Sequence, residues 1–131
     1  MASRTEVLTD IEETLGFVPQ WLAQIPDHSI ESEWSQMKDW EMADTAIPSK
    51  YKQLIGLAVA ANMQCDYCVA FHTEGARLHG ASDAEIEEAC RMAKMTTGWS
   101  SYLKGLQIDL AQFKQDVRQI CEHSRARGEA A

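Results

Sequence analysis

Residues 47–80, IPSKYKQLIGLAVAANMQCDYCVAFHTEGARLHG, decide the fold of this chain. Pro48 interrupts the helical pattern of the sequence. The segment after it contains few polar residues beyond its first helical turn, which predicts the central buried helix of the protein. A second helix is expected from about Asp66 to His79. Gly80 closes it, because glycine readily takes the left-handed conformation that ends many helices.

The rest of the chain shows the same helical spacing of apolar residues. The further segments expected to be helical are one that ends at Gly16, one between Pro19 and Pro26, one from about Ser29 to Ala43, one opened by the capping box of Ser82 and Glu85, a short one between Gly98 and Gly105, and one from about Leu106 to Ser124. No alternating pattern typical of β-strands competes with these helices. We therefore predict an all-α fold, a single-domain helical bundle of about six to seven helices over residues 1–131.

The composition describes an acidic globular protein. Hydrophobic residues make up 45% of the 131 residues, and the formal net charge is −8. Nucleic acid and anionic membranes are therefore poor partners. The amino terminus has no apolar signal core, and the longest apolar run, Leu54–Ala61, is far shorter than the roughly 20 residues that a membrane-spanning helix needs. We expect a cytoplasmic protein, whose reducing surroundings disfavour structural disulfides and favour catalytic or metal-binding cysteines.

Cys65, Cys68 and His72 have the spacing of a redox site. If this segment is helical, their side chains lie within about 60° of one another around the helix. The cysteines begin the helix, where unpaired backbone N–H groups and the helix dipole stabilise a thiolate and lower a cysteine pKa from about 8.5 toward 7. His72 lies one turn after Cys68 and can accept its proton. The pattern favours a dithiol that attacks a substrate, is oxidised, and is resolved by its neighbour.

Two other interpretations of these residues stay open. The cysteines can be ordinary core residues, since cysteine is often buried. They can also bind zinc together with His72, although the sequence offers no obvious fourth ligand. Attachment of haem is excluded, because Val69 rather than histidine follows Cys68. The two remaining cysteines, Cys90 and Cys121, lie in apolar helical stripes and are expected in the core.

These residues and their flanking helices resemble the alkyl hydroperoxidase D-like, or carboxymuconolactone decarboxylase, superfamily. The matching stretch covers residues 47–89, where the run L-I-x-L-A-V-A-A is followed by C-x-Y-C-x-x-x-H-T and then by G-A-S-D-x-E-I. Residues 15–27, LGFVPQWLAQIPD, resemble the usual entry segment of the family. The resemblance implies an all-helical subunit of the alkyl hydroperoxidase D-like type that assembles into trimers or hexamers.

The resemblance also implies roles for the site residues. Cys68 is the acidic thiol that meets a hydroperoxide or disulfide, Cys65 resolves it, and His72 relays the proton. Reduction comes from a partner dithiol, such as a lipoyl group or a thioredoxin-like protein, and neither a cofactor nor a metal is expected. Gln53 stands where redox members usually carry a glutamate, and Tyr67 stands where some carry a histidine. Glutamine can hydrogen-bond His72 but cannot accept its proton, so this departure predicts a weaker proton relay.

The predicted function is that of a thiol-dependent peroxidase or disulfide reductase acting on a small hydroperoxide or disulfide. One alternative is a decarboxylase-like protein of other activity, although the resemblance associates that branch with the absence of the cysteine pair. A second is a redox-responsive or low-activity oligomeric scaffold in which Gln53 marks an impaired relay. Gln53 can also be an ordinary exposed residue in an early helical turn. Its stripe on the helix includes Gly56, whose small size would let the dithiol helix approach closely.

Overall fold

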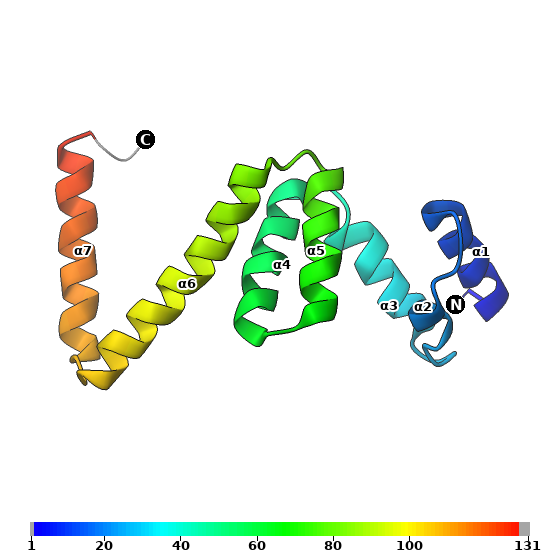
Figure 1. Cartoon of the computed structure of the whole chain (residues 1–131), viewed down its shortest axis with the longest axis horizontal. Helices are drawn as coiled ribbons and strands as arrows, with labels where there is room; N and C mark the ends of the chain where they lie inside the picture. Colours follow the sequence, from blue (N-terminus) through cyan, green and yellow to red (C-terminus); the bar gives the residue numbers. More distant parts are fainter. Residues whose placement is uncertain (1, 129–131) are drawn as a thin grey trace.

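The computed structural model describes residues 2–128, and the regular structure in this range is helical (Figure 1). In chain order the elements are α1 (Arg4–Leu15), α2 (Gln20–Ala23), α3 (Ile30–Gln36), the π-helical turn η1 (Met37–Glu41), α4 (Ser49–Met63), α5 (Asp66–Leu78), α6 (Asp83–Gly105) and α7 (Leu110–Ala126). The all-α prediction is confirmed, with seven α-helices in the described part of the chain.

Local sequence signals explain where several helices begin and end. Gly16 caps α1 and Gly80 follows α5, both with a φ of 85°, a conformation that glycine adopts without steric cost. Ser82 and Glu85 form the expected capping box at the start of α6, with bonds of 2.8 and 3.1 Å between each side chain and the backbone N–H of the other residue. The tight connection between α5 and α6 therefore follows directly from the sequence.

Two expected boundaries are wrong. Helix α6 passes through Gly98 without a break. A glycine inside a helix costs only about 1 kcal/mol relative to alanine, which by itself is too little to end a helix. Helix α7 begins at Leu110 rather than Leu106, because the side chain of Asp109 caps it there.

The first three α-helices form a small apolar core of their own, made of Val7, Ile11, Leu22, Ile30 and Trp34. A hydrogen bond and a salt bridge join α1 to the α3–η1 segment beside this core. The Asp10 carboxylate accepts from Trp34 Nε1 at 2.6 Å and from Lys38 Nζ at 2.6 Å. The start of η1 is therefore anchored on α1, and the chain leaves it toward α4.

Helix α4 packs against both α5 and α6 and lies between the two ends of the molecule (Figure 1). Leu57 and Ala60 are buried in this packing, whereas Ile55 and Val59 are about half exposed. The prediction of a buried central helix is therefore right for one face of α4. The other face is open in the single chain.

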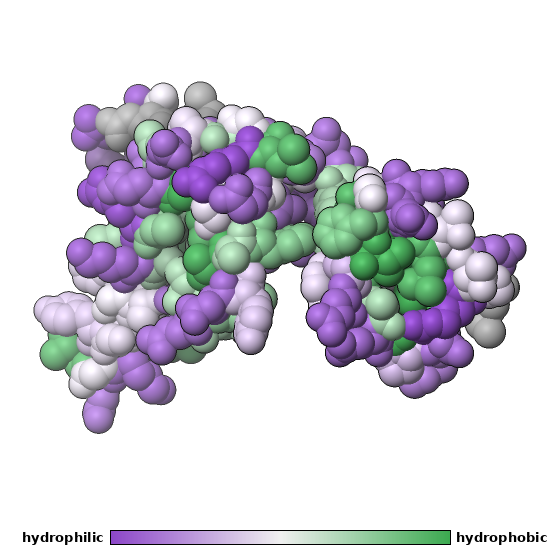
Figure 2. Space-filling view, turned by 45° about the vertical axis from the view of Figure 1, so that its right-hand side comes forward, coloured by the Kyte–Doolittle hydropathy of each residue, from purple (hydrophilic) through white to green (hydrophobic). Residues whose placement is uncertain are grey.

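Helices α6 and α7 extend away from this centre, so that the chain is elongated (Figure 1). None of the residues Leu110–Ala126 is buried, and hydrophobic side chains reach the visible surface in several places (Figure 2). Cys90 and Cys121, expected in the core, are exposed, because no helix within residues 2–128 covers their faces. Within residues 2–128, no helix has both the length and the apolar character needed to cross a membrane.

Candidate active site

The dithiol lies where α5 begins, as the spacing predicted. Gln64 adopts a left-handed conformation with a φ of 54° and turns the chain from α4 into α5. Cys65 is the N-cap of α5, and its Sγ accepts the backbone N–H of Cys68 at 3.4 Å. Both thiols are free and half-buried. The helix entrance thus brings the two sulfurs together with unpaired backbone donors nearby.

The two thiols differ in acidity, and the order is the reverse of what the resemblance implies. A hydrogen bond from the Cys68 thiol, followed by the bond from the Cys68 backbone N–H, lowers the pKa of Cys65. The same bond between the sulfurs raises the pKa of Cys68, and the nearby Glu41 carboxylate adds to that rise. The physical reason is position. Cys65 alone caps the helix, so its thiolate receives the backbone donors, while Cys68 lies one turn further in and faces a negative charge.

His72 is held by Gln53 across the α4–α5 contact. Its Nδ1 lies 2.9 Å from Gln53 Oε1, and Gln53 is only 2% exposed. The alternative that Gln53 is an ordinary exposed residue is therefore wrong. Gln53 Nε2 donates to the backbone carbonyl of Glu41 at 3.5 Å. Because a carbonyl can only accept, this bond fixes the amide orientation.

The amide orientation in turn fixes the protonation of the imidazole. Since Gln53 Oε1 is an acceptor, Nδ1 of His72 carries the hydrogen and Nε2 is left free to accept one. Burial lowers the pKa of His72, and the negative charge of Glu41 opposes this shift in part. The site therefore holds a neutral imidazole whose free nitrogen can take a thiol proton.

Two glycines make this packing possible. A Cβ added at Gly56 would lie 2.5 Å from Cε1 of His72, and a Cβ added at Gly75 would lie 2.7 Å from Oε1 of Gln53. Both distances are far below van der Waals contact, so each site residue rests directly on the backbone of the facing helix. The close approach expected at Gly56 is confirmed.

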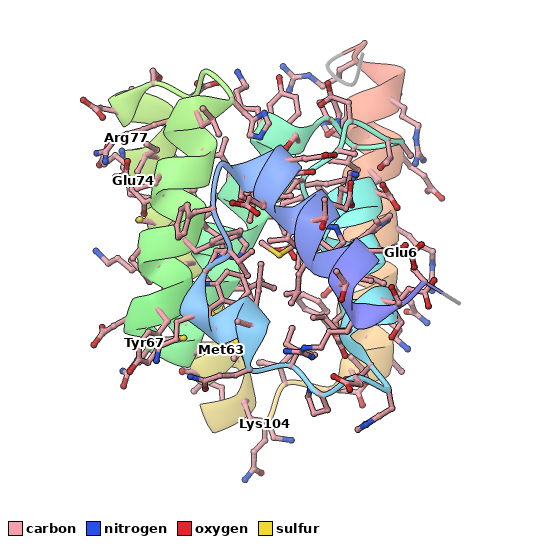
Figure 3. The ribbon with its side chains drawn as sticks, turned by 90° about the vertical axis from the view of Figure 1, so that its right-hand side faces the viewer. Glu6, Met63, Tyr67, Glu74, Arg77 and Lys104 are labelled. Carbon is pink, nitrogen blue, oxygen red and sulfur yellow. The ribbon has the colours of Figure 1, made fainter. Side chains whose placement is uncertain are left out.

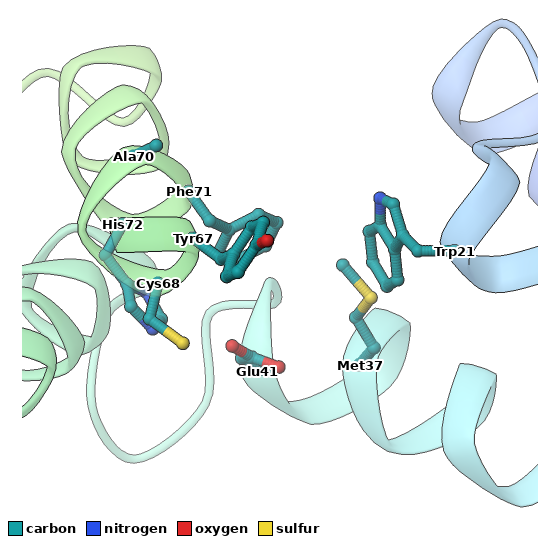
Figure 4. A pocket seen from close by; sticks show the side chains of 8 residues that line it. All are labelled: Trp21, Met37, Glu41, Tyr67, Cys68, Ala70, Phe71 and His72. Carbon is teal, nitrogen blue, oxygen red and sulfur yellow. The ribbon is translucent and has the colours of Figure 1, made fainter. Parts of the chain in front are cut away.

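Cys68 and His72 line a cavity of about 620 Å³ between α5 and the α2–η1 part of the chain. Figure 4 shows the Cys68 sulfur and the Glu41 carboxylate facing each other across it, with Trp21 and Met37 on the far wall. Its lining is mostly apolar, and its size is in the range of small-ligand sites. A hydrophobic molecule with one polar reactive group fits this chemistry.

Tyr67 also lines the cavity, but the residue is 89% exposed. It lies at the same end of the α4–α5 pair as Met63 (Figure 3). Glu74 and Arg77, which form a salt bridge of 2.8 Å, project from α5 on its outer surface (Figure 3). Tyr67 is thus placed at the mouth of the cavity, away from the hydrogen bond between His72 and Gln53 of α4.

Sequence reasoning did not find Glu41, Trp21 or Met37, which come from elements far before the dithiol in the chain. No spacing rule links these three residues to Cys68. The sequence showed only that they lie in segments expected to be helical. In residues 2–128, no group of three or more His, Cys, Asp or Glu side chains is arranged to hold a metal ion. The zinc alternative stays an untested prediction.

Comparisons with known proteins bear on the family and the fold of the chain. The model of the carboxymuconolactone decarboxylase family matches residues 32–109. The chain belongs to this family. Its fold is that of a solved structure described as the alkylhydroperoxidase AhpD core from Rhodospirillum rubrum, with a TM-score of 0.71, 24% identity and coverage of 81% of each chain.

Two curated relatives share the central part of the chain. "Uncharacterized protein 4 in cox locus" of Paracoccus denitrificans is 35% identical over 74 residues, which is 56% of this chain and 67% of the relative. An uncharacterized protein of Cupriavidus necator is 40% identical over 45 residues, or 34% of this chain and 40% of the relative. The family and the fold are thus established.

Proposed function

We propose that the protein is a thiol-dependent peroxidase or disulfide reductase in which Cys68 meets the substrate and Cys65 resolves it. The observation that carries this proposal is the placement of Cys68 on the cavity wall, beside a neutral His72 and in contact with a second thiol. The cavity is large enough for a small organic hydroperoxide, and its apolar walls favour the carbon part of such a molecule.

The chemistry begins with loss of the Cys68 thiol proton to Nε2 of His72. The thiolate attacks one oxygen of the hydroperoxide, the O–O bond breaks, and the departing alkoxide takes the proton back from the imidazolium. Cys68 is then a sulfenic acid. The Cys65 thiolate attacks its sulfur and releases hydroxide, which is protonated to water, and a disulfide remains. The backbone N–H of Cys68 supports this second step, because its bond to Cys65 Sγ lowers the pKa of the resolving thiol and favours its thiolate.

An external dithiol, such as a lipoyl group or a thioredoxin-like protein, would return the disulfide to the dithiol form by thiol–disulfide exchange. We include a cytoplasmic location in the proposal, since a reducing compartment supplies such dithiols. Two features favour a slower variant of the same function. The raised pKa of Cys68 leaves little thiolate at neutral pH, and Gln53 offers His72 a neutral oxygen in place of a carboxylate. A redox-responsive scaffold with weak turnover is therefore the second candidate.

Hydroperoxide consumption with a panel of dithiols tests the proposal. Cys68→Ser is expected to abolish consumption, and Cys65→Ser is expected to allow one turnover that stops at a sulfenic acid detectable by dimedone labelling. Cys90→Ser is the matched control, because Cys90 is exposed on α6 outside the cavity. A Cys68→Ser protein that consumes peroxide as fast as the wild type refutes the assignment. Wild-type protein that forms the disulfide but turns over only slowly favours the scaffold.

We further propose that the working form is a homo-oligomer, a trimer or hexamer. The chain exposes 9784 Å². A compact monomer of 14.7 kDa would expose about 6,900 Å². The excess of roughly 2,900 Å² exceeds the ~800 Å² that each partner buries in an ordinary interface.

Apolar side chains account for much of this surface. Leu110, Phe113, Val117 and Ile120 repeat at helical spacing on α7 and are all exposed. Ile55, Val59 and Met63 form an exposed row on α4. These faces belong to the same chain and are both uncovered, so a second copy of the chain is the occupant that we propose for them.

A further inference from the structure

Glu41 lines both of the hollows that lie beside the dithiol. The cavity of about 620 Å³ has a neighbour of about 380 Å³ on the α4 side. The two hollows share Glu41, Cys68 and His72. Figure 4 shows the Glu41 carboxylate on the wall opposite α5, directed toward the Cys68 sulfur. A carboxylate, a thiol and an imidazole therefore meet at the junction of two openings.

The backbone around Glu41 is held in place from α4. Lys52 Nζ donates to the carbonyl oxygens of Trp40 and Ala43, and Gln53 Nε2 donates to that of Glu41 itself. Three carbonyls within four residues thus bond to two neighbouring side chains of one helix. This fixes the end of η1 relative to α4, and the half-buried Glu41 side chain is positioned by its backbone.

The charge of Glu41 is not neutralised by an ion pair within residues 2–128. The titratable groups that face it are Cys68, His72 and Tyr67 of α5 and Lys52 of α4. Lys52 directs its ammonium group to the backbone carbonyls. The negative charge raises the pKa of both His72 and Cys68. These two effects oppose each other in the transfer of the thiol proton: the higher His72 pKa favours the transfer, and the higher Cys68 pKa disfavours it.

We propose that Glu41 is the carboxylate of the proton relay in this chain, where it stabilises the His72 imidazolium while that ring holds the Cys68 proton. The inference rests on the proposed function and adds to it a residue on a different element from Gln53. The proton moves from Cys68 Sγ to His72 Nε2 and then to the alkoxide, and Glu41 keeps its charge throughout. Its negative charge favours the intermediate imidazolium, although it disfavours the thiolate beside it.

These opposing effects give Glu41→Gln a distinctive signature. Loss of the charge makes the Cys68 thiol more acidic, so alkylation by iodoacetamide, which needs no proton donor, should be as fast as in the wild type or faster. Hydroperoxide reduction should nevertheless fall by about 10-fold or more, because a lower His72 pKa leaves less imidazolium to protonate the departing alkoxide. The His72 pKa measured by NMR should fall in the same variant.

Asp39→Asn is the matched control. Asp39 lies on the same π-helical turn and loses the same charge on substitution, but it lines a different hollow together with Asp10 and Lys38. It is expected to change neither rate. Glu41→Asp keeps the charge and should retain a measurable part of the peroxide rate. Circular dichroism checks that each variant folds.

Peroxide reduction by Glu41→Gln that is as fast as in the wild type, or faster, would show that Glu41 only perturbs the thiol and would overturn the inference. An unchanged His72 pKa would overturn it as well. Wild-type protein that does not reduce hydroperoxides would instead refute the proposed function. The His72 pKa would then still report whether Glu41 acts on the imidazole.

Discussion

Replacing Gly56 by alanine tests whether His72 rests on the backbone of α4. In a helix this substitution normally stabilises by about 1 kcal/mol, because alanine loses less conformational entropy than glycine. At Gly56, however, the added Cβ would lie 2.5 Å from Cε1 of His72 and 2.6 Å from Nδ1 and Nε2. The ring must therefore move by about 1 Å to restore ordinary contact.

The cost of that movement can be worked from the structure. Overpacking of this kind costs about 1–3 kcal/mol, and losing the 2.9 Å bond between His72 and Gln53 costs roughly 0.5–1.5 kcal/mol more. After the gain in helix propensity, we expect a net loss of roughly 1–3 kcal/mol in the free energy of unfolding. A displacement of 1 Å at a proton-transfer residue can also reduce the rate of peroxide reduction by about 10²-fold.

Gly98 provides the matched control, since it is also inside a helix and a Cβ there meets nothing within 4 Å. Gly98→Ala should stabilise the protein by about 1 kcal/mol and leave the peroxide rate unchanged. Urea unfolding at equal protein concentration and single-turnover peroxide reduction measure the two effects. If Gly56→Ala is stabilised as much as Gly98→Ala and reacts normally, the described packing of His72 is wrong.

The remaining predictions concern the amide, the imidazole and the assembly. Gly75→Ala should push Gln53 away from His72 and slow peroxide reduction, while iodoacetamide alkylation of the dithiol stays unchanged; an equal loss in both reactions would contradict this. Gln53→Glu should raise the His72 pKa measured by NMR and speed peroxide reduction, and it should lower stability because a buried carboxylate faces a backbone carbonyl. Since burial lowers the pKa of His72, the stability that its neutral form contributes is complete above about pH 6.5 and is lost as the pH falls through the folded pKa. Urea unfolding of wild type and His72→Asn should therefore differ in pH dependence below that value, and parallel curves would be evidence against burial of the ring. Val117→Asp on α7 should reduce the mass measured by light scattering, whereas an unchanged mass would exclude this face from the interface.

Much of the site could be predicted because its signals are local. The spacing placed the two sulfurs at a helix entrance and His72 one turn after Cys68, and the structure keeps that arrangement. The hydrogen bond from the Cys68 backbone N–H to the cap side chain of Cys65, three residues earlier, depends on a few adjacent dihedral angles, which the sequence controls directly. Gly98 shows the limit of such signals, since α6 continues through it and the cost of about 1 kcal/mol for a glycine did not end the helix.

The sequence by itself determined the helices, most of their caps and the meeting of the two sulfurs with an imidazole. Only the tertiary structure decided that Gln53 is buried against His72 and that Glu41 faces Cys68. Helical propensity and capping act through neighbouring backbone groups, whereas these two properties depend on which elements pack together and which charges that packing brings close. The same reason explains the open apolar face of α7, whose periodicity was evident in the sequence but which no other helix within residues 2–128 buries.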